Sequence, residues 1–270
     1  MSISVEILET GTIRIRPSIG RNRSWTEPLP INTYLINHPE GHILFDSGES
    51  PHTMKPGYFP LWMPFFHMAV NIHVRPHEGI GARLKQRGLE PKDLKAVVLS
   101  HLHHDHGDGL PGLIGPPVYV SQEHWDAYKH PFEATMEGAV PNQWPKGFVP
   151  TILEPTGGPI RPWERSYPLT SDGKVVAVDT PGHVPGHLSV IVFGDEATYF
   201  LGGDATYDQE LLDQEVTDGV NSNPLLAIES VRKIKEFARQ KNVVLLPAHD
   251  PDAARRLAEK DFYKPSPSRL

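Results

Sequence analysis

The 270-residue sequence contains no cysteine, which excludes both disulfide bonds and thiolate metal ligands. Any metal bound by this chain must therefore be held by nitrogen and oxygen donors. The lack of cysteine also suits a reducing compartment. No basic stretch followed by an apolar run begins the sequence, so we see no signal peptide and expect a cytoplasmic protein.

Clusters of Lys and Arg are also missing, and 26 basic against 33 acidic residues give a formal net charge of −7. This balance argues against nucleic acid as a partner. No apolar run approaches the roughly 20 residues needed to cross a bilayer, so we expect no membrane partner. The hydrophobic content of 38% fits a globular protein, and we expect a single domain over residues 1–270.

Short apolar or alternating segments predict strands, beginning with a pair of strands at residues 3–7 and 12–15. Further strands are expected at 32–36, 42–45, 96–100, 117–120, 174–178, 188–193, 197–200 and 243–246. Helices are expected at 77–87, 122–129, 224–240 and 252–260. Residues 54–66 are too rich in proline for a regular helix, and 131–168 are expected to form loops. Strands followed by a helix occur twice, which predicts an α/β sandwich of two sheets with helices outside.

Four histidines and one aspartate follow the expected strand 96–100 within six residues: His101, His103, His104, Asp105 and His106. So many polar groups beside a core would cost desolvation free energy without partners, whereas a metal ion accepts imidazole and carboxylate ligands. In extended backbone the first and third residues of this segment point to the same side. The aspartate and the last histidine then project toward a neighbouring point, which predicts two adjacent metal sites.

This pattern, His-x-His-x-Asp-His, resembles the signature of the metallo-β-lactamase superfamily. Three later segments, each after an expected strand, resemble the remaining ligand positions of that family and contain His183, Asp204 and His249. Asp46 is similar to an early aspartate of the family that orients a ligand. The resemblance covers most of the chain and implies an αββα sandwich of two mixed sheets.

The resemblance also implies two divalent metal ions. One would be held by His101, His103 and His183, the other by Asp105, His106 and His249, with Asp204 bridging the two. Zinc is the expected metal, although iron, manganese and cobalt also accept these donors. A water shared by the ions would become a hydroxide near neutral pH and attack an electrophilic carbonyl.

Several branches of the superfamily do not fit this sequence. The branch of β-lactamases with a cysteine ligand is excluded. The 21 residues after His249 leave no room for the glutathione-binding domain of glyoxalase II, and neither a flavin domain nor a basic arm is present. The lactonase branch remains, which implies a small cyclic ester as substrate.

Tyr207, three residues after Asp204, is similar to a tyrosine of N-acyl-homoserine lactonases. Its phenol would hydrogen-bond the lactone carbonyl or the oxyanion, and Asp105 would pass a proton to the leaving alkoxide. The alternative for Tyr207 is a structural role. We therefore expect a quorum-quenching lactonase. A lactamase or carbamate hydrolase acting on a small heterocycle at the same dinuclear site is the alternative, and a non-catalytic binding module is disfavoured because all seven ligands are present.

The stretch 58–66 combines five aromatic residues with two prolines and lies close after an expected strand. Such an apolar loop beside the metals suits the acyl chain of a lactone substrate. The other interpretation is a contact between two copies of the chain in a homodimer, and the two are compatible.

Overall fold

The computed structural model describes residues 2–16 and 25–266 and contains, within them, two mixed β-sheets. The first sheet has the strand order β4 (Val70–His73), β1 (Ser4–Ile15), β2 (Leu29–His38), β3 (Gly41–Phe45), β5 (Leu94–Val98), β6 (Val118–Val120), β7 (Thr151–Ile152). The second has the order β12 (Val243–Pro247), β11 (Thr198–Gly203), β10 (Leu188–Phe193), β9 (Val175–Asp179), β8 (Tyr167–Pro168). Each sheet contains parallel and antiparallel pairs, because β3, β5, β6 and β7 run parallel in the first and β11 with β12 in the second.

The helices are α1 (Pro64–Ala69), α2 (Ile80–Lys85), α3 (His104–Gly107), α4 (Gln122–Tyr128), α5 (Pro131–Met136), α6 (Gln209–Gln214), α7 (Pro224–Gln240) and α8 (Ala253–Glu259). Short 3-10 turns occupy Pro51–Met54, Pro91–Asp93, Leu110–Gly112 and Pro141–Gln143. The long helix α7 starts as its sequence predicts, since the side chain of Asn223 accepts from the Leu226 amide and proline takes the first helical position. No helix among the described residues has the length and apolar character that a membrane crossing requires.

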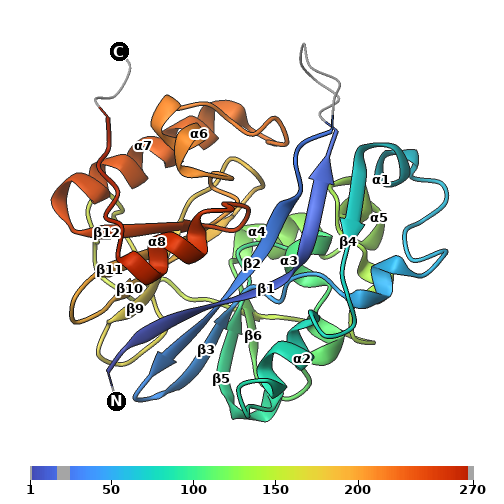
Figure 1. Ribbon diagram of the computed structural model, residues 1–270, viewed down its shortest axis with the longest axis horizontal. Helices are drawn as coiled ribbons and strands as arrows, with labels where there is room; N and C mark the ends of the chain where they lie inside the picture. The colour runs from blue at the N-terminus through green and yellow to red at the C-terminus, as the bar shows by residue number, and fades with distance from the viewer. Residues whose placement is uncertain (1, 17–24, 267–270) are drawn as a thin grey trace.

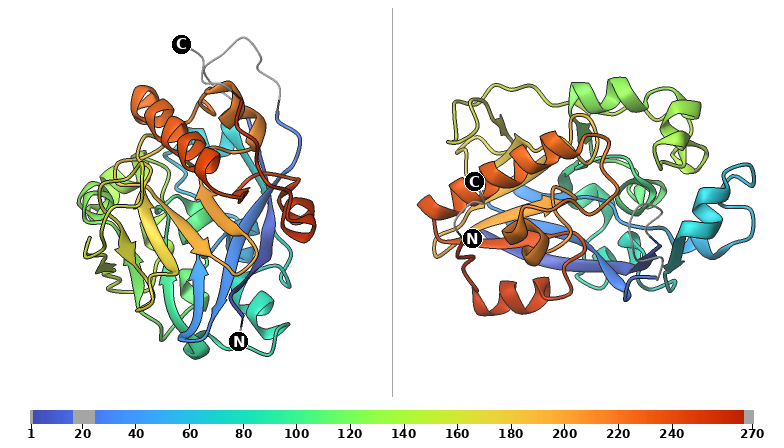
Figure 2. Two further views of the ribbon diagram at one scale, coloured as in Figure 1. Left: turned by 90° about the vertical axis from the view of Figure 1, so that its left-hand side faces the viewer. Right: turned by 90° about the horizontal axis from the view of Figure 1, so that it is seen from above.

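The two sheets face each other across a shared apolar layer. Tyr34 and Phe45 of the first sheet belong to the same buried cluster as Val190 and Leu246 of the second. A second cluster joins α7 to the outer face of β9 to β12, and a third joins α2, α4 and α5 to the outer face of the first sheet. The outside position of α7 is visible in Figure 1 and from two other directions in Figure 2. The predicted αββα sandwich is confirmed.

Some predicted elements were wrong in detail. The first two predicted strands form one long strand, β1, which bends at a bulge between Glu9 and Thr12 because Gly11 adopts a φ of 114°. Helix α1 begins inside the proline-rich stretch 54–66, since a proline is accepted at the first helical position. In the same way α5 begins at Pro131, in a region that we expected to be all loop.

Candidate metal centre

The predicted ligands lie at one end of the sandwich, where β5, β9, β11 and β12 finish. His101 and His103 follow β5, and the short helix α3 then carries Asp105 and His106. The other three ligands occupy separate loops, and His183 follows β9, Asp204 follows β11 and His249 follows β12. Buried strands thus deliver residues from distant parts of the sequence to one place.

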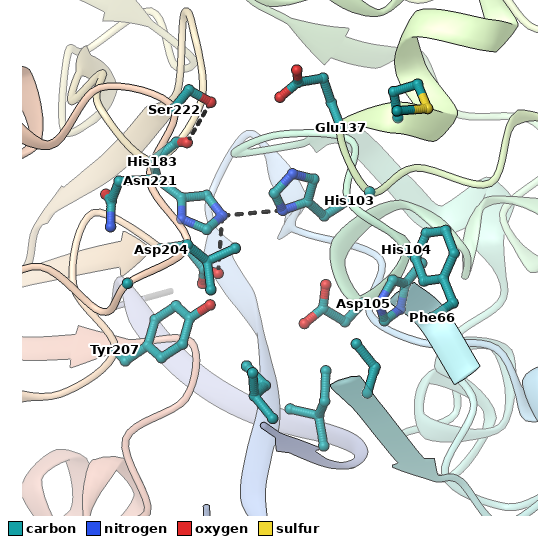
Figure 3. A pocket seen from close by; sticks show the side chains of 17 residues that line it. Phe66, His103, His104, Asp105, Glu137, His183, Asp204, Tyr207, Asn221 and Ser222 are labelled. Carbon is teal, nitrogen blue, oxygen red and sulfur yellow. Dashed lines mark hydrogen bonds and ion pairs between the residues drawn. The ribbon is translucent and has the colours of Figure 1, made fainter. Parts of the chain in front are cut away.

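Asp204 stands between the imidazoles. Its Oδ1 lies 3.2 Å from His106 Nε2 and 3.4 Å from His249 Nε2, and its Oδ2 lies 3.5 Å from His183 Nε2. The Nε2 atom of His183 in turn lies 3.0 Å from Nδ1 of His103. Figure 3 shows His103, His183, Asp204 and Asp105 around one cavity.

The structure brings together the two sets of ligands that the sequence predicts. One set offers ligand atoms within 4.8 Å of one another from His101, His103 and His183, and another does so from Asp105, His106 and His249. A third set, made of His101, His106 and Asp204, joins them. The third set shares one residue with each of the other two and adds Asp204 between them.

The donor atoms of this cluster fit divalent cations. Four of them are buried and have no hydrogen-bond partner among the described residues: Nε2 of His101, of His106 and of His249, and Oδ1 of Asp204. Buried polar atoms are nearly always paired, because an unpaired one loses its hydration without compensation. Nitrogen and oxygen donors facing each other without partners are what a bound metal ion would satisfy.

The charges within the cluster also fit a bound cation. Burial and the neighbouring imidazoles hold the pKa of His101 well below its ordinary value, so His101 is in the neutral form that binds metals. Burial would also lower the pKa of His249, but the carboxylates of Asp204 and Asp105 raise it to about 10. The two carboxylates thus create a negative potential at the centre of the site, which a cation would neutralise.

In most of these histidines, the ring nitrogen that faces away from the cluster makes a hydrogen bond. His106 donates from Nδ1 to Oδ2 of Asp46 at 2.9 Å, as expected for an aspartate that orients a ligand. The same carboxylate accepts from the Ser100 hydroxyl at 2.9 Å, and that hydroxyl lies 2.9 Å from Nδ1 of His101. The Nδ1 atom of His249 donates to the carbonyl of Pro30 at 2.9 Å.

Sequence reasoning missed some of these supporting residues. The hydroxyl of Tyr128, on α4, lies 3.1 Å from Nε2 of His103, and no local pattern in the sequence singles it out. His187, which has no ligand role in the predicted sets, accepts a hydrogen bond from the backbone amide of Asp204 at 3.1 Å and so supports the Asp204 loop. The sequence offers a signal for His187, because residues 185–187 repeat the Pro-Gly-His step that contains His183.

His104 does not join the ligand sets. Its Nδ1 lies 2.6 Å from Oε2 of the fully buried Glu49, and its ring packs edge-on against Phe59 and Phe66 at centroid distances of 5.3 and 5.7 Å. These contacts dock the aromatic stretch 58–66 on helix α3.

A cavity of about 270 Å³ opens beside the cluster, and some of the predicted ligands line it. Tyr207, 9% exposed, lines it together with Asp105 and Asp204. The apolar part of the wall includes Ile13, Ile15, Phe66, Val70 and Met136. Burial, and then the nearby carboxylates, raise the pKa of Tyr207 well above its ordinary value, so its phenol keeps its proton.

Comparison with known proteins agrees with this geometry. Residues 26–249 match the metallo-beta-lactamase superfamily, and the chain belongs to that superfamily.

Within it, the chain is similar to an N-acyl homoserine lactonase of a Bacillus species, with 30% identity over 225 residues that cover 82% of each chain. It is also similar to the N-acyl homoserine lactonase AttM of Azorhizobium caulinodans, with 26% identity, 93% of this chain and 94% of the relative covered. The fold matches that of an N-acyl homoserine lactone hydrolase solved with N-hexanoyl-L-homoserine at its catalytic metal centre, with a TM-score of 0.77, 24% identity and full coverage of both chains. The dizinc quorum-quenching lactonase AidC has the same fold at a TM-score of 0.65 and 15% identity, with 92% and 88% covered.

Proposed function

We propose that this protein is a metal-dependent hydrolase that opens the ring of N-acyl-homoserine lactones. The observation that carries the proposal is the position of Asp204 between two sets of metal-binding side chains, beside a cavity lined by Tyr207. The likeness to N-acyl homoserine lactonases along most of the chain supports the substrate class.

The site would hold two ions, with zinc as the proposed metal. His101, His103 and His183 would bind one, Asp105, His106 and His249 the other, and Asp204 both. When bound, such ions lower the pKa of a coordinated water and polarise a carbonyl.

The chain's own residues supply the remaining chemistry. Tyr207 keeps its phenolic proton and would donate a hydrogen bond to the carbonyl oxygen as negative charge develops on it. Asp105 lines the same cavity and would take up the proton that the attacking water loses and pass it to the alkoxide oxygen that leaves when the ring opens.

The apolar wall of the cavity would receive the acyl chain. Within the stretch 58–66, the side chain of Phe66 is 3% exposed and lines the cavity. Leu61 and Trp62 are 83% and 55% exposed and face outward. The inward side suits the substrate, and the outward side is where we place the contact of a homodimer.

The proposal is tested by following proton release from N-hexanoyl-homoserine lactone with zinc-loaded protein, with and without a chelator. We expect ring opening that the chelator abolishes and added zinc restores. The matching γ-lactam and a cyclic carbamate, run in parallel, represent the alternative substrates.

Turnover of the lactam or carbamate but not of the lactone would replace the proposed substrate class. Lactone turnover that survives complete removal of metal would refute the metal mechanism.

A further inference from the structure

The five ligand histidines differ in what holds the nitrogen that faces away from the cluster. In four of them, His101, His103, His106 and His249, that nitrogen lies 2.9 to 3.1 Å from an oxygen of Ser100, Tyr128, Asp46 or Pro30. His183 is the exception, because its Nδ1 is buried and has no hydrogen-bond partner among the described residues.

A carboxylate nevertheless points at this nitrogen. Oδ2 of Asp218 lies 3.7 Å from Nδ1 of His183, and the Asp218 side chain is only 3% exposed. Its other oxygen, Oδ1, accepts from the amide of Val220 and from Nδ2 of Asn221, both at 2.7 Å. The carboxylate is thus fixed in direction, with one oxygen left for the imidazole.

The residues that follow Asp218 in the chain also hold the backbone around His183 by hydrogen bonds. The hydroxyl and the amide of Ser222 both donate to the carbonyl of His183 at 2.9 Å, and the amide of Asn223 donates to the carbonyl of Gly182 at 2.9 Å. Figure 3 shows Asn221 and Ser222 beside His183. Because these residues also line the cavity, one segment forms both a wall of the pocket and the support of a ligand.

We propose that Asp218 is the positioning residue of His183 and sets the affinity of the metal ion that His101, His103 and His183 would hold. A carboxylate that accepts from the outer nitrogen of a ligand histidine fixes the ring and makes it a better donor, and loss of such a partner weakens metal binding by about 10- to 100-fold. At 3.7 Å the two atoms lie just beyond hydrogen-bond distance, so the proposal requires the two side chains to approach slightly when metal binds. The inference rests on the proposed two-metal site.

The test is a zinc titration of metal-free protein against a chromophoric chelator, for the wild type, for Asp218→Asn and for Asp208→Asn. Asparagine at 218 keeps the shape but offers an amide N–H to His183 Nδ1 in place of an acceptor. The control residue, Asp208, caps α6 in the same stretch of chain. We expect one of two zinc ions to bind 10- to 100-fold more weakly in Asp218→Asn, full lactonase activity to return at high free zinc, and the control to match the wild type.

Identical zinc affinities in the wild type and in Asp218→Asn would overturn the inference. So would loss of both ions together, or a large fall in the melting temperature of the metal-free variant, including failure to fold, since these would make Asp218 a purely structural residue. If the wild type bound fewer than two zinc ions, the two-metal site itself would be refuted. The zinc stoichiometry of the wild type is therefore measured before any variant is compared with it.

Discussion

Buried polar side chains at this site are arranged for a ligand that is not part of the polypeptide. Asp105 and Asp204 lie close to several imidazoles, yet the unpaired donor atoms remain. A core built for stability alone would replace such groups with apolar ones, because buried ion pairs rarely repay their desolvation. The cluster is therefore explained as a binding site for metal ions and not as a contribution to stability.

Asp204→Asn tests the bridging position. An amide offers one oxygen instead of two equivalent ones and no negative charge, so we expect the variant to lose metal stoichiometry together with turnover. Elemental analysis of purified protein measures the first and lactone hydrolysis the second. A variant with full metal content and full activity would show that Asp204 bridges nothing.

Tyr207→Phe tests the phenol. Removing one donor to a developing oxyanion costs roughly 10- to 1000-fold in kcat, while the ring still fills its place in the cavity wall. Steady-state kinetics on N-hexanoyl-homoserine lactone measures the effect, with metal content expected to stay unchanged. Tyr199→Phe is the matched control, since Tyr199 packs in the core between the sheets. Equal rates for Tyr207→Phe and the wild type would assign Tyr207 a structural role.

Among the secondary-structure elements, the loop from β9 to β10 depends most on tight packing. Gly182, at a φ of 137°, lies so close to the start of α7 that a Cβ there would overlap the backbone of Ala227. The loop can therefore hold His183 in place only with glycine at this position.

Gly182→Ala should lower the free energy of unfolding by about 2 kcal/mol or more, because it adds both overpacking and backbone strain. Chemical denaturation measures the change. Gly158→Ala provides the control, since a Cβ at Gly158 meets no atom within 4 Å and should leave stability nearly unchanged. Equal stability of the two variants would contradict the tight contact with α7.

In the molecule as a whole, the site joins the two halves of the sandwich. Its residues extend from Asp46, after β3 of the first sheet, to His249, after β12 of the second. The apolar layer shared by both sheets supports our proposal that residues 1–270 form one domain. Metal binding should therefore stabilise the whole fold and not one loop.

We expect chelation to lower the melting temperature of the entire protein. A metal present at 100 times its dissociation constant contributes about 2.7 kcal/mol per site, and two sites then correspond to a fall of roughly 10 to 20 °C for a domain of this size. Differential scanning calorimetry with and without chelator measures it, and zinc should restore the original transition. An unchanged transition would mean that folding and metal binding are uncoupled.

The sequence by itself determined the parts that local patterns encode. The signature around His101 and the three later ligand segments predicted which residues meet, because each follows a buried strand and the ends of such strands gather at one end of a sandwich. Asp46 and Tyr207 could be named because they resemble residues of the metallo-β-lactamase superfamily and of N-acyl-homoserine lactonases. The cap and the length of α7 followed from Asn223 and from the apolar face of the helix.

Only the tertiary structure decided the rest. Asp218 and Tyr128 lie in stretches without any motif, and they contact His183 and His103 because chain segments far apart in sequence pack together. The same holds for the apolar cavity wall, to which β1, β4 and α5 each contribute side chains. A sequence pattern reports the backbone period and the local chemistry of one segment, whereas these contacts depend on distances between segments that only the packed fold fixes.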